Sequence, residues 1–310
     1  NDGTIVGDET VVADEGANQL FGGEGDDLIA IGGYDAGGAI TTAATIADAN
    51  GATGGEAFGG NGDDFILGTA TGDDLVGLGD GDDTVVLGDG DSTVYAGAGD
   101  TGVGDVTAGD GDNTIYVGAG NDVITSVGNG DNTIGLGAGN DTATTIGTGD
   151  NMVFGGAGDD TITGGTGDDT IFGGDDDDTL NTGNGNNVAD GGAGDDTITG
   201  GTGNDVITGG AGDDTITVVA GGNNTVTGGA GDDTLTAGGG TDTFVFAEGD
   251  GDDTIATFAV NVDEIDFTAL GVSSLSDLVT EETGGSTTIF FGDGDSVTLT
   301  GVALATLDND

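Results

Sequence analysis

The sequence predicts an all-β fold, a parallel β-solenoid of tandem nonapeptide repeats followed by a C-terminal β cap. The nine residues GGAGDDTIT of 155–163 return unchanged at 191–199 and 209–217, and the near copy GGAGDDTLT occupies 228–236. Self-similarity at a short fixed period is the sequence signature of a solenoid. After about residue 241 the repeat gives way to longer apolar stretches with several Phe residues, as expected where the end of a solenoid core must be closed.

Each nonad divides into a turn and a strand. Its first six residues, such as GGAGDD, place Gly where a positive φ is needed and Asp or Asn where a turn is tolerated. Its last three, such as TIT, alternate polar, apolar and polar, which predicts a very short strand with one inward side chain. Such strands are stable only when stacked, and with two nonads per coil each coil gives one strand to each of two sheets. The expected inward residues are Ile115, Ile124, Ile134, Val153, Ile162, Ile171, Leu180, Ile198, Ile207, Ile216 and Val226.

The register of the repeat sets the expected domain boundaries. Nonads follow each other without a gap over 155–217, and single inserted residues extend the register in both directions. Residues 31–58 break the period and look like a loop or an enlarged coil. The sequence therefore predicts an N-terminal irregular segment with one repeat over 1–58, a repeat domain over 59–256 and a C-terminal β cap over 257–310.

The charge of the chain makes a cation partner a near requirement. The 310 residues include 59 Asp and Glu but no Lys, Arg or His, which gives a net charge of −59. Self-repulsion of this size opposes any compact state unless counter-charge is supplied from outside. Nucleic acids and anionic membrane surfaces are excluded as partners because both are bound through Lys and Arg. No stretch approaches the roughly 18 to 20 apolar residues of a membrane span, so we expect no membrane insertion.

The composition also argues against catalysis. Without His, Lys, Arg or Cys the chain cannot build a serine or cysteine triad, a zinc motif or a basic phosphate clamp. A carboxylate pair of the kind that hydrolyses glycosides is the one arrangement left. The repeats, however, distribute carboxylates over many equivalent turns rather than around one cleft. We therefore expect that the chain is not an enzyme.

The repeat resembles the repeats-in-toxin (RTX) family, whose calcium-binding repeat is G-G-x-G-x-D-x-U-x. The resemblance covers at least 59–256. It implies a parallel β-roll that binds multiple Ca²⁺ ions between successive turns on the same edge, with the sixth-position Asp and turn carbonyls as ligands. The chemistry agrees, because Ca²⁺ takes six to eight hard oxygens and the chain offers carboxylates, amides and carbonyls. An EF-hand is excluded, since no Glu follows runs such as GDGDD at the required distance.

The candidate calcium ligands are the sixth-position Asp residues and their equivalents in the looser repeats. They are Asp27, Asp64, Asp74, Asp83, Asp122, Asp141, Asp160, Asp169, Asp178, Asp196, Asp205, Asp214, Asp233, Asp242 and Asp253.

Alternate nonads differ at the sixth position, which predicts two unlike edges. One set, the Asp edge, carries Asp122, Asp141, Asp160, Asp178, Asp196, Asp214, Asp233 and Asp253. The other set, the Asn edge, carries Asn113, Asn132, Asn151, Asp169, Asn187, Asp205, Asn224 and Asp242. We expect a continuous line of calcium ions on the Asp edge and weaker, partial or absent binding on the Asn edge, where stacked amides can bond without a metal. Neutral drift between Asn and Asp is the alternative.

The two strand faces differ as well. On the sheet that follows the Asp edge, Thr-x-Thr recurs in rows that resemble the ice-binding face of some antifreeze solenoids, although Thr suits any exposed strand. The opposite sheet carries Tyr95, Tyr116, Met152, Phe154 and Phe172. Exposed aromatic rows often mark a contact surface. The alternative is that they pack under the irregular segment 31–58.

The C-terminal segment predicts a hairpin and a route of export. The stretch TTIFFGDGDSVTLTGV at 287–302 reads as two strands joined by a Gly/Asp turn. The segment looks like the C-terminal region of RTX proteins exported by type I secretion, whose signal is uncleaved, and no basic N-terminal secretion signal precedes it. The chain ends in LDND at 307–310, whereas the family commonly ends in an acidic residue followed by an apolar cluster.

The expected function is calcium-gated folding outside the cell. The chain would stay extended in low calcium and fold in extracellular calcium into a secreted structural subunit of an S-layer, filament or matrix, through self-association at the cell surface. The first alternative is a folding and secretion module at the C-terminal end of a larger toxin, hydrolase or adhesin, which a chain beginning at Asn1 permits. The second alternative is an ice-binding solenoid.

Overall fold

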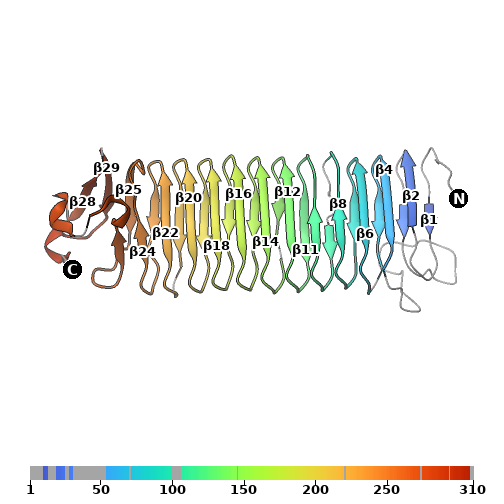
Figure 1. Cartoon of the computed structure of the whole chain (residues 1–310), viewed down its shortest axis with the longest axis horizontal. Helices are drawn as coiled ribbons and strands as arrows, with labels where there is room; N and C mark the ends of the chain where they lie inside the picture. The colour runs from blue at the N-terminus through green and yellow to red at the C-terminus, as the bar shows by residue number, and fades with distance from the viewer. Residues whose placement is uncertain are drawn as a thin grey trace. The chain divides into compact units, whose positions relative to one another are not determined.

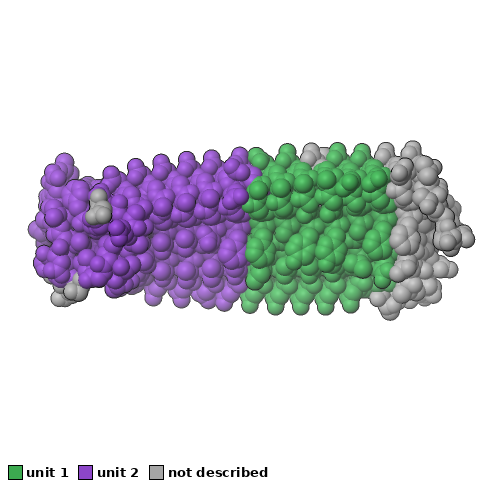
Figure 2. All heavy atoms as spheres, turned by 45° about the horizontal axis from the view of Figure 1, so that its top comes forward, with its two compact units in different colours: residues 1–157 green, residues 158–310 purple. Residues whose placement is uncertain are grey.

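The computed structural model divides the chain into two compact units, residues 1–157 and 158–310, coloured separately in Figure 2. Each unit is built of short β-strands, with almost no helix (Figure 1). The structure describes residues 10–12, 19–24, 28–30, 54–69, 71–99, 106–144, 146–219, 221–272, 274–292 and 294–307. The candidate ligand Asp27 and most of the irregular segment 31–58 therefore lie outside the described residues.

Unit 1 contains two parallel sheets, each of which takes one strand from every coil. One sheet has the order β1-β3-β5-β7-β9-β11-β13 and the other the order β2-β4-β6-β8-β10-β12-β14. The strands are β1 (Thr10–Val12), β2 (Gln19–Glu24), β3 (Leu28–Ala30), β4 (Glu56–Asn61), β5 (Phe65–Leu67), β6 (Leu75–Asp80), β7 (Thr84–Val86), β8 (Thr93–Tyr95), β9 (Val106–Ala108), β10 (Thr114–Tyr116), β11 (Val123–Val127), β12 (Thr133–Ala138), β13 (Thr142–Ala143) and β14 (Met152–Ala157).

Unit 2 continues the same alternation. One sheet has the order β15-β17-β19-β21-β23-β25-β29-β28-β27 and the other β16-β18-β20-β22-β24-β26. The strands are β15 (Thr161–Thr163), β16 (Thr170–Asp175), β17 (Thr179–Asn181), β18 (Val188–Ala193), β19 (Thr197–Gly200), β20 (Val206–Ala211), β21 (Thr215–Val218), β22 (Thr225–Ala230), β23 (Thr234–Thr236), β24 (Thr243–Val245), β25 (Asp252–Ala256), β26 (Glu264–Asp266), β27 (Val279–Thr283), β28 (Ser286–Phe291) and β29 (Asp295–Leu299).

Within each unit, neighbouring strands are parallel up to β26 and in register apart from one shift between β9 and β11, so the predicted parallel β-solenoid is confirmed. In unit 2, Ile198 lies between Leu180 and Ile216 in adjacent strands, and its side chain is fully buried. All the side chains predicted to point inward are at most 1% exposed. Burial of one apolar side chain per strand is thus repeated along each stack, and it produces a thin continuous core.

Turn glycines allow successive coils to approach closely. Gly192 has φ +117°, and a Cβ at this position would overlap the carbonyl oxygen of Gly174 in the preceding coil. Both the left-handed backbone and the short distance between coils therefore require Gly here. An inserted residue is accommodated differently: the register of β11 against β9 shifts between Ile124 and Ser126, as in a β-bulge.

The exposed aromatic residues of unit 1 stand in one row. Tyr95, Tyr116 and Gly135 are paired across β8, β10 and β12, and Phe154 follows Gly135 in β14. The rings of Tyr95 and Tyr116 stack with centroids 5.8 Å apart and planes 12° apart. Tyr95 is 50% exposed, Tyr116 39% and Phe154 40%. The row is therefore largely open to solvent within the described residues.

The C-terminal part of unit 2 closes the core. The predicted hairpin is confirmed as β28 and β29, which pair antiparallel, and β29 lies parallel to β25 (Figure 1). A third strand that the sequence did not indicate, β27, pairs with β28. Phe246, Phe267 and Phe291 form a cluster with ring centroids 5.2 to 5.8 Å apart. These rings replace the small aliphatic side chains of the repeats at the end of the stack.

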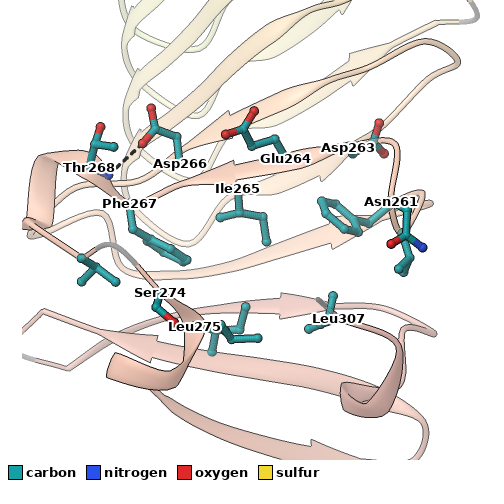
Figure 3. A pocket seen from close by; sticks show the side chains of 14 residues that line it. Asn261, Asp263, Glu264, Ile265, Asp266, Phe267, Thr268, Ser274, Leu275 and Leu307 are labelled. Carbon is teal, nitrogen blue, oxygen red and sulfur yellow. Dashed lines mark hydrogen bonds between the residues drawn. The ribbon is translucent and has the colours of Figure 1, made fainter. Parts of the chain in front are cut away.

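A cavity of about 490 Å³ lies beside β26 in this cap. Figure 3 shows Ile265 and Phe267 pointing into it, with Leu275 and Leu307 on the opposite wall. Asp266 and Glu264 point to the other side of the strand, and the backbone N–H of Thr268 donates to Oδ1 of Asp266 at 2.8 Å. The cavity therefore has apolar side chains on two facing walls, and polar residues such as Asn261, Asp263 and Ser274 complete its lining.

Candidate functional site

Sixth-position Asp side chains form a buried column on the Asp edge of each unit, and the strand order adds Asp64 and Asp83 to this edge in unit 1. Each lies directly before an odd-numbered strand, or within its first two residues in the case of Asp253, and the described members are at most 2% exposed. In seven of them, one carboxylate oxygen accepts a backbone N–H from the equivalent residue of the preceding coil. In unit 1 the N–H groups of Asp64 and Asp122 donate to Oδ1 of Asp83 and Asp141, at 2.8 and 2.7 Å. In unit 2 the bonds run from Asp160 to Asp178, Asp178 to Asp196, Asp196 to Asp214, Asp214 to Asp233 and Asp233 to Asp253, at 2.7 to 2.9 Å.

The second oxygen of these carboxylates is left without a hydrogen bond at many positions. Oδ2 is buried and has no hydrogen-bond partner in Asp83, Asp178, Asp196, Asp214, Asp233 and Asp253. An unpartnered buried carboxylate oxygen is strongly unfavourable unless a cation or a donor reaches it. Hard carboxylate oxygens are also the ligands that Ca²⁺ prefers. The Asp edge therefore fits a calcium ion by the chemistry of its donors.

Burial makes these carboxyls hard to ionise in the absence of a metal. Burial is the largest cause of each shift, neighbouring carboxylates add to it, and the accepted backbone N–H opposes it. The pKa rises from its usual value near 3.8 to about 6 for Asp196 and Asp233, about 7 for Asp83, Asp178 and Asp214, and about 8 for Asp253. A cation between the coils would oppose these shifts, because its positive charge favours the ionised carboxylates.

The Asn edge of unit 1 is bonded differently. Nδ2 of Asn113 donates to the carbonyl oxygens of Gly109 and Gly111, at 3.1 and 3.0 Å, and to Oδ1 of Asn132 in the next coil, at 3.1 Å. The backbone N–H of Asn113 donates to the same Oδ1, at 2.9 Å. The amides thus connect turn to turn through hydrogen bonds alone, as expected for stacked Asn side chains.

On the Asn edge of unit 2, amides and carboxylates alternate. Asn187 donates through its backbone N–H and Nδ2 to Oδ1 of Asp205, at 2.9 and 3.0 Å. Oδ2 of Asp205 has no hydrogen-bond partner, and burial raises the pKa of Asp205. Asp242 differs, because its Oδ2 accepts the N–H of Gly238 at 3.2 Å. Asp169 is 1% exposed and donates its own N–H to Oδ1 of Asn187 at 2.9 Å.

Asp74, the first described acid in the corresponding column of unit 1, is fully hydrogen-bonded. Its Oδ2 accepts the backbone N–H of Thr69 at 2.7 Å and the hydroxyl at 3.0 Å, while Oδ1 accepts the N–H of Gly55 at 3.0 Å. In the next coil Ser92 takes the sixth position. Both oxygens of Asp74 therefore already have donors, unlike those of the Asp edge.

The fifth-position acids form a second, exposed column that the sequence did not predict. The N–H of Asp195 donates to Oδ1 of Asp177 and the N–H of Asp213 to Oδ1 of Asp195, both at 2.8 Å. Oδ1 of Asp159 accepts the N–H of Asp177 at 3.2 Å. The donation runs in the opposite direction to that of the buried column. The two adjacent acids in each copy of GGAGDDTIT were the available signal for a second column.

The described residues include no group of three or more acidic side chains placed to hold a metal ion together. A site on the Asp edge would therefore combine carboxylates of neighbouring coils with backbone carbonyls. Within the described parts of the chain, the helices are single 3₁₀ turns, and none is long and apolar enough to cross a membrane.

The comparisons with known proteins agree with this chemistry. The family model of the RTX calcium-binding nonapeptide repeat matches residues 6–33, 78–100, 107–143, 145–180, 181–216 and 220–252, which together make up more than half of the chain. Repeats of this kind bind multiple Ca²⁺ ions. No curated protein sequence matches the chain.

A solved structure is also similar, although only distantly. It is the crystal structure of the extracellular lipase LipA from Serratia marcescens, at 20% identity and a TM-score of 0.29, and the match covers 64% of this chain and 44% of the lipase. The chain thus matches less than half the length of the lipase. From the repeated family match along the chain, the protein belongs to the RTX calcium-binding nonapeptide repeat family.

Proposed function

We propose that the chain is a secreted protein that folds when calcium binds along its Asp edge. The observation that carries the proposal is the row of buried, unpartnered Oδ2 atoms on successive coils, represented by Asp178, Asp196 and Asp214. These carboxylates, with turn carbonyls, would hold the ions. Bound calcium would supply positive charge to oxygens that have no donor in the protein.

Calcium would act as a switch through mass action. The net charge of −59 favours an extended chain in low calcium, and each bound ion cancels two of these charges. Ligands that bind only the folded state stabilise it in proportion to the logarithm of their concentration. Extracellular calcium modules typically bind calcium with a Kd of about 10⁻⁴ to 10⁻³ M. With such a Kd the chain would stay unfolded at the low calcium concentration of the cytoplasm and fold outside the cell. That RTX proteins are typically secreted supports this location.

Circular dichroism tests the switch directly. In excess chelator the full chain is expected to show the spectrum of an unfolded protein, and millimolar calcium should restore the β signal. Magnesium at the same concentration serves as the control for ionic strength. A β spectrum that persists unchanged in chelator contradicts the proposal.

The role of the folded protein is proposed to be structural, as a subunit of an S-layer, filament or matrix. The sequence contains no His, Lys, Arg or Cys, the side chains on which most catalytic sites depend, and this composition supports a non-catalytic role. Electron microscopy of the purified chain in calcium should show filaments or layers that disappear in chelator. Monomers at all concentrations in calcium would contradict a role in self-association.

A second candidate function is a folding and secretion module at the C-terminal end of a larger toxin, hydrolase or adhesin. The cap favours it, because β29 extends the sheet of the last repeat and β28 and β27 complete a compact end. The mass of the secreted product distinguishes the two roles. Export of the chain as part of a much longer polypeptide would favour the module.

A third candidate is ice binding, favoured by a column of in-register Thr side chains. Thr179, Thr197 and Thr215 pair across β17, β19 and β21, and Thr161 and Thr234 extend the column on either side. Thermal hysteresis of the folded protein in calcium is the measurement. Its absence at high protein concentration would exclude this candidate.

A further inference from the structure

The Asn edge of unit 1 contains a run of neutral side chains at the position where the Asp edge carries carboxylates. Ser92, Asn113, Asn132 and Asn151 occupy the sixth position in successive coils, and each is at most 2% exposed. The coils of Asn113 and Asn132 also contribute Asp122 and Asp141 to the Asp edge. The same pair of coils therefore presents two buried carboxylates on one edge and two buried amides on the other.

Each amide nitrogen is directed at several oxygens at once. Nδ2 of Asn132 donates to the carbonyl oxygens of Gly128 and Gly130, at 3.3 and 2.9 Å, and to Oδ1 of Asn151, at 2.9 Å. Asn113 repeats this pattern one coil earlier. Turn carbonyls and the side-chain oxygen of the next coil thus converge on one positively polarised group.

A carboxylate at this position cannot do the same, because it has no N–H to donate. Oδ1 of Asp83, on the Asp edge of the same unit, takes a backbone N–H from the adjacent coil, but its Oδ2 remains buried and unpartnered. A calcium ion on the Asp edge would supply the positive charge that this oxygen lacks. The amide supplies a positive end on the Asn edge without any ion.

We propose that the Asn amides of unit 1 take the place of calcium, so that the turns of Asn113, Asn132 and Asn151 hold no ion and calcium loads these coils from the Asp edge alone. The inference rests on the calcium binding proposed above and specifies which turns of unit 1 bind no calcium. Two features carry it: the oxygens that surround Nδ2 already have their donor, and the sixth position offers no anionic ligand. The calcium affinity of protein sites depends strongly on the number of charged ligands.

The test exchanges the two edges within the same coils of the full chain. The double substitution Asn113→Asp and Asn132→Asp replaces two facing amides with two facing carboxylates. It is expected to add at least one calcium ion per chain, measured by isothermal titration calorimetry and by elemental analysis after gel filtration in calcium. The matched control, Asp122→Asn with Asp141→Asn, makes the reverse change on the opposite edge and should remove at least one ion.

A calcium count that stays equal to that of the wild type in the folded Asn-to-Asp variant would overturn the inference, because the Asn turns would then already hold ions. Anomalous scattering from wild-type crystals grown in calcium gives a readout that does not depend on the variants folding. Ions along the Asp edge and none between the turns of Asn113 and Asn132 support the inference. Equal ions on both edges overturn it and leave calcium-driven folding intact, whereas a wild-type chain that binds no calcium overturns both.

Discussion

The backbone N–H of Asp178 donates to Oδ1 of Asp196, 2.7 Å away in the next coil, while Oδ2 of Asp196 is buried without a partner. One oxygen of the carboxylate thus has a structural role and the other is available to a cation. The next residue toward the N-terminus, Asp195, is exposed and bonds to the outer column instead. These adjacent acids therefore provide a matched pair for mutation.

Asp196→Asn is expected to have opposite effects with and without calcium. The variant loses a charged ligand, so the number of bound ions should fall by at least one. At calcium 100-fold above Kd, loss of one ion lowers the free energy of unfolding by about 2.7 kcal/mol. In chelator the same substitution removes a buried charge and should stabilise whatever β structure remains. Urea unfolding in calcium and in chelator, together with calorimetric counting of ions, measures both effects.

Asp195→Asn is the control for this experiment, since it changes the net charge equally at the exposed fifth position. It should leave the ion count unchanged and alter the stability in calcium by no more than about 0.5 kcal/mol. An equal loss of ions in both variants would show that the buried and the outer columns do not differ as ligands.

In the absence of calcium, low pH is expected to stabilise the folded state, because protonation neutralises the buried carboxylates. In the metal-free fold the pKa of Asp178 and Asp214 is about 7 and that of Asp253 about 8, against about 3.9 in an unfolded chain. The folded state therefore binds more protons than the unfolded state between pH 4 and pH 8. Because the pKa is higher in the folded state, ionisation of these carboxyls destabilises the metal-free fold. This loss of stability is complete above pH 8, decreases as the pH falls, and is absent below about pH 4. Circular dichroism in chelator should show β structure increasing from pH 8 to pH 5.

The comparison is with the same titration in millimolar calcium, where the ions already neutralise the Asp edge and the β signal should change little from pH 8 to pH 6. A metal-free chain that gains β structure as the pH rises would contradict the assignment of the raised pKa values to the folded Asp edge.

The sequence predicted most of the fold because the repeat is short and nearly exact. A single apolar residue in each three-residue strand leaves one choice for the inward position, so Ile198 and Ile216 could be placed before the structure was known. The end of the stack was less predictable. β27 contains four polar or acidic residues among its five and pairs with the edge that β28 presents. Its pairing therefore depends on tertiary structure rather than on its own pattern.

The candidate site could be predicted as a column of residues but not in its bonding. The repeat places Asp74 and Asp205 in equivalent positions of their nonads. In Asp74, Oδ2 accepts the N–H of Thr69, and Oδ1 accepts the hydroxyl of Thr69 and the N–H of Gly55. In Asp205, by contrast, Oδ2 has no hydrogen-bond partner. Thr69, at the first position of its nonad, supplies both donors to Oδ2 of Asp74, whereas Gly200 stands at that position in the nonad of Asp205. This effect of a neighbouring side chain becomes visible only when the turn geometry is known.

Truncation of the core should be costly in the calcium-loaded protein. Ile198 is fully buried between Leu180 and Ile216, and its replacement by Ala removes packing contacts and leaves a cavity. Ile198→Ala is expected to lower the free energy of unfolding by about 2 to 5 kcal/mol. Val206, 48% exposed in the other sheet, is the control, and Val206→Ala should change stability by less than about 0.5 kcal/mol. Guanidinium unfolding in saturating calcium measures both, and comparable losses would contradict the inward assignment.

Two turn glycines separate backbone strain from the close approach of coils. Gly192 and Gly221 both have positive φ, +117° and +104°, but a Cβ at Gly192 would overlap the carbonyl of Gly174, whereas Gly221 has open space around it. Gly221→Ala should cost about 1 kcal/mol, because only the left-handed backbone opposes it. Gly192→Ala must also push two coils apart, so its loss in urea unfolding should exceed that of Gly221→Ala and be accompanied by weaker calcium binding at the neighbouring Asp196. Equal losses in the two variants would mean that backbone conformation, and not the distance between coils, is what requires glycine in these turns.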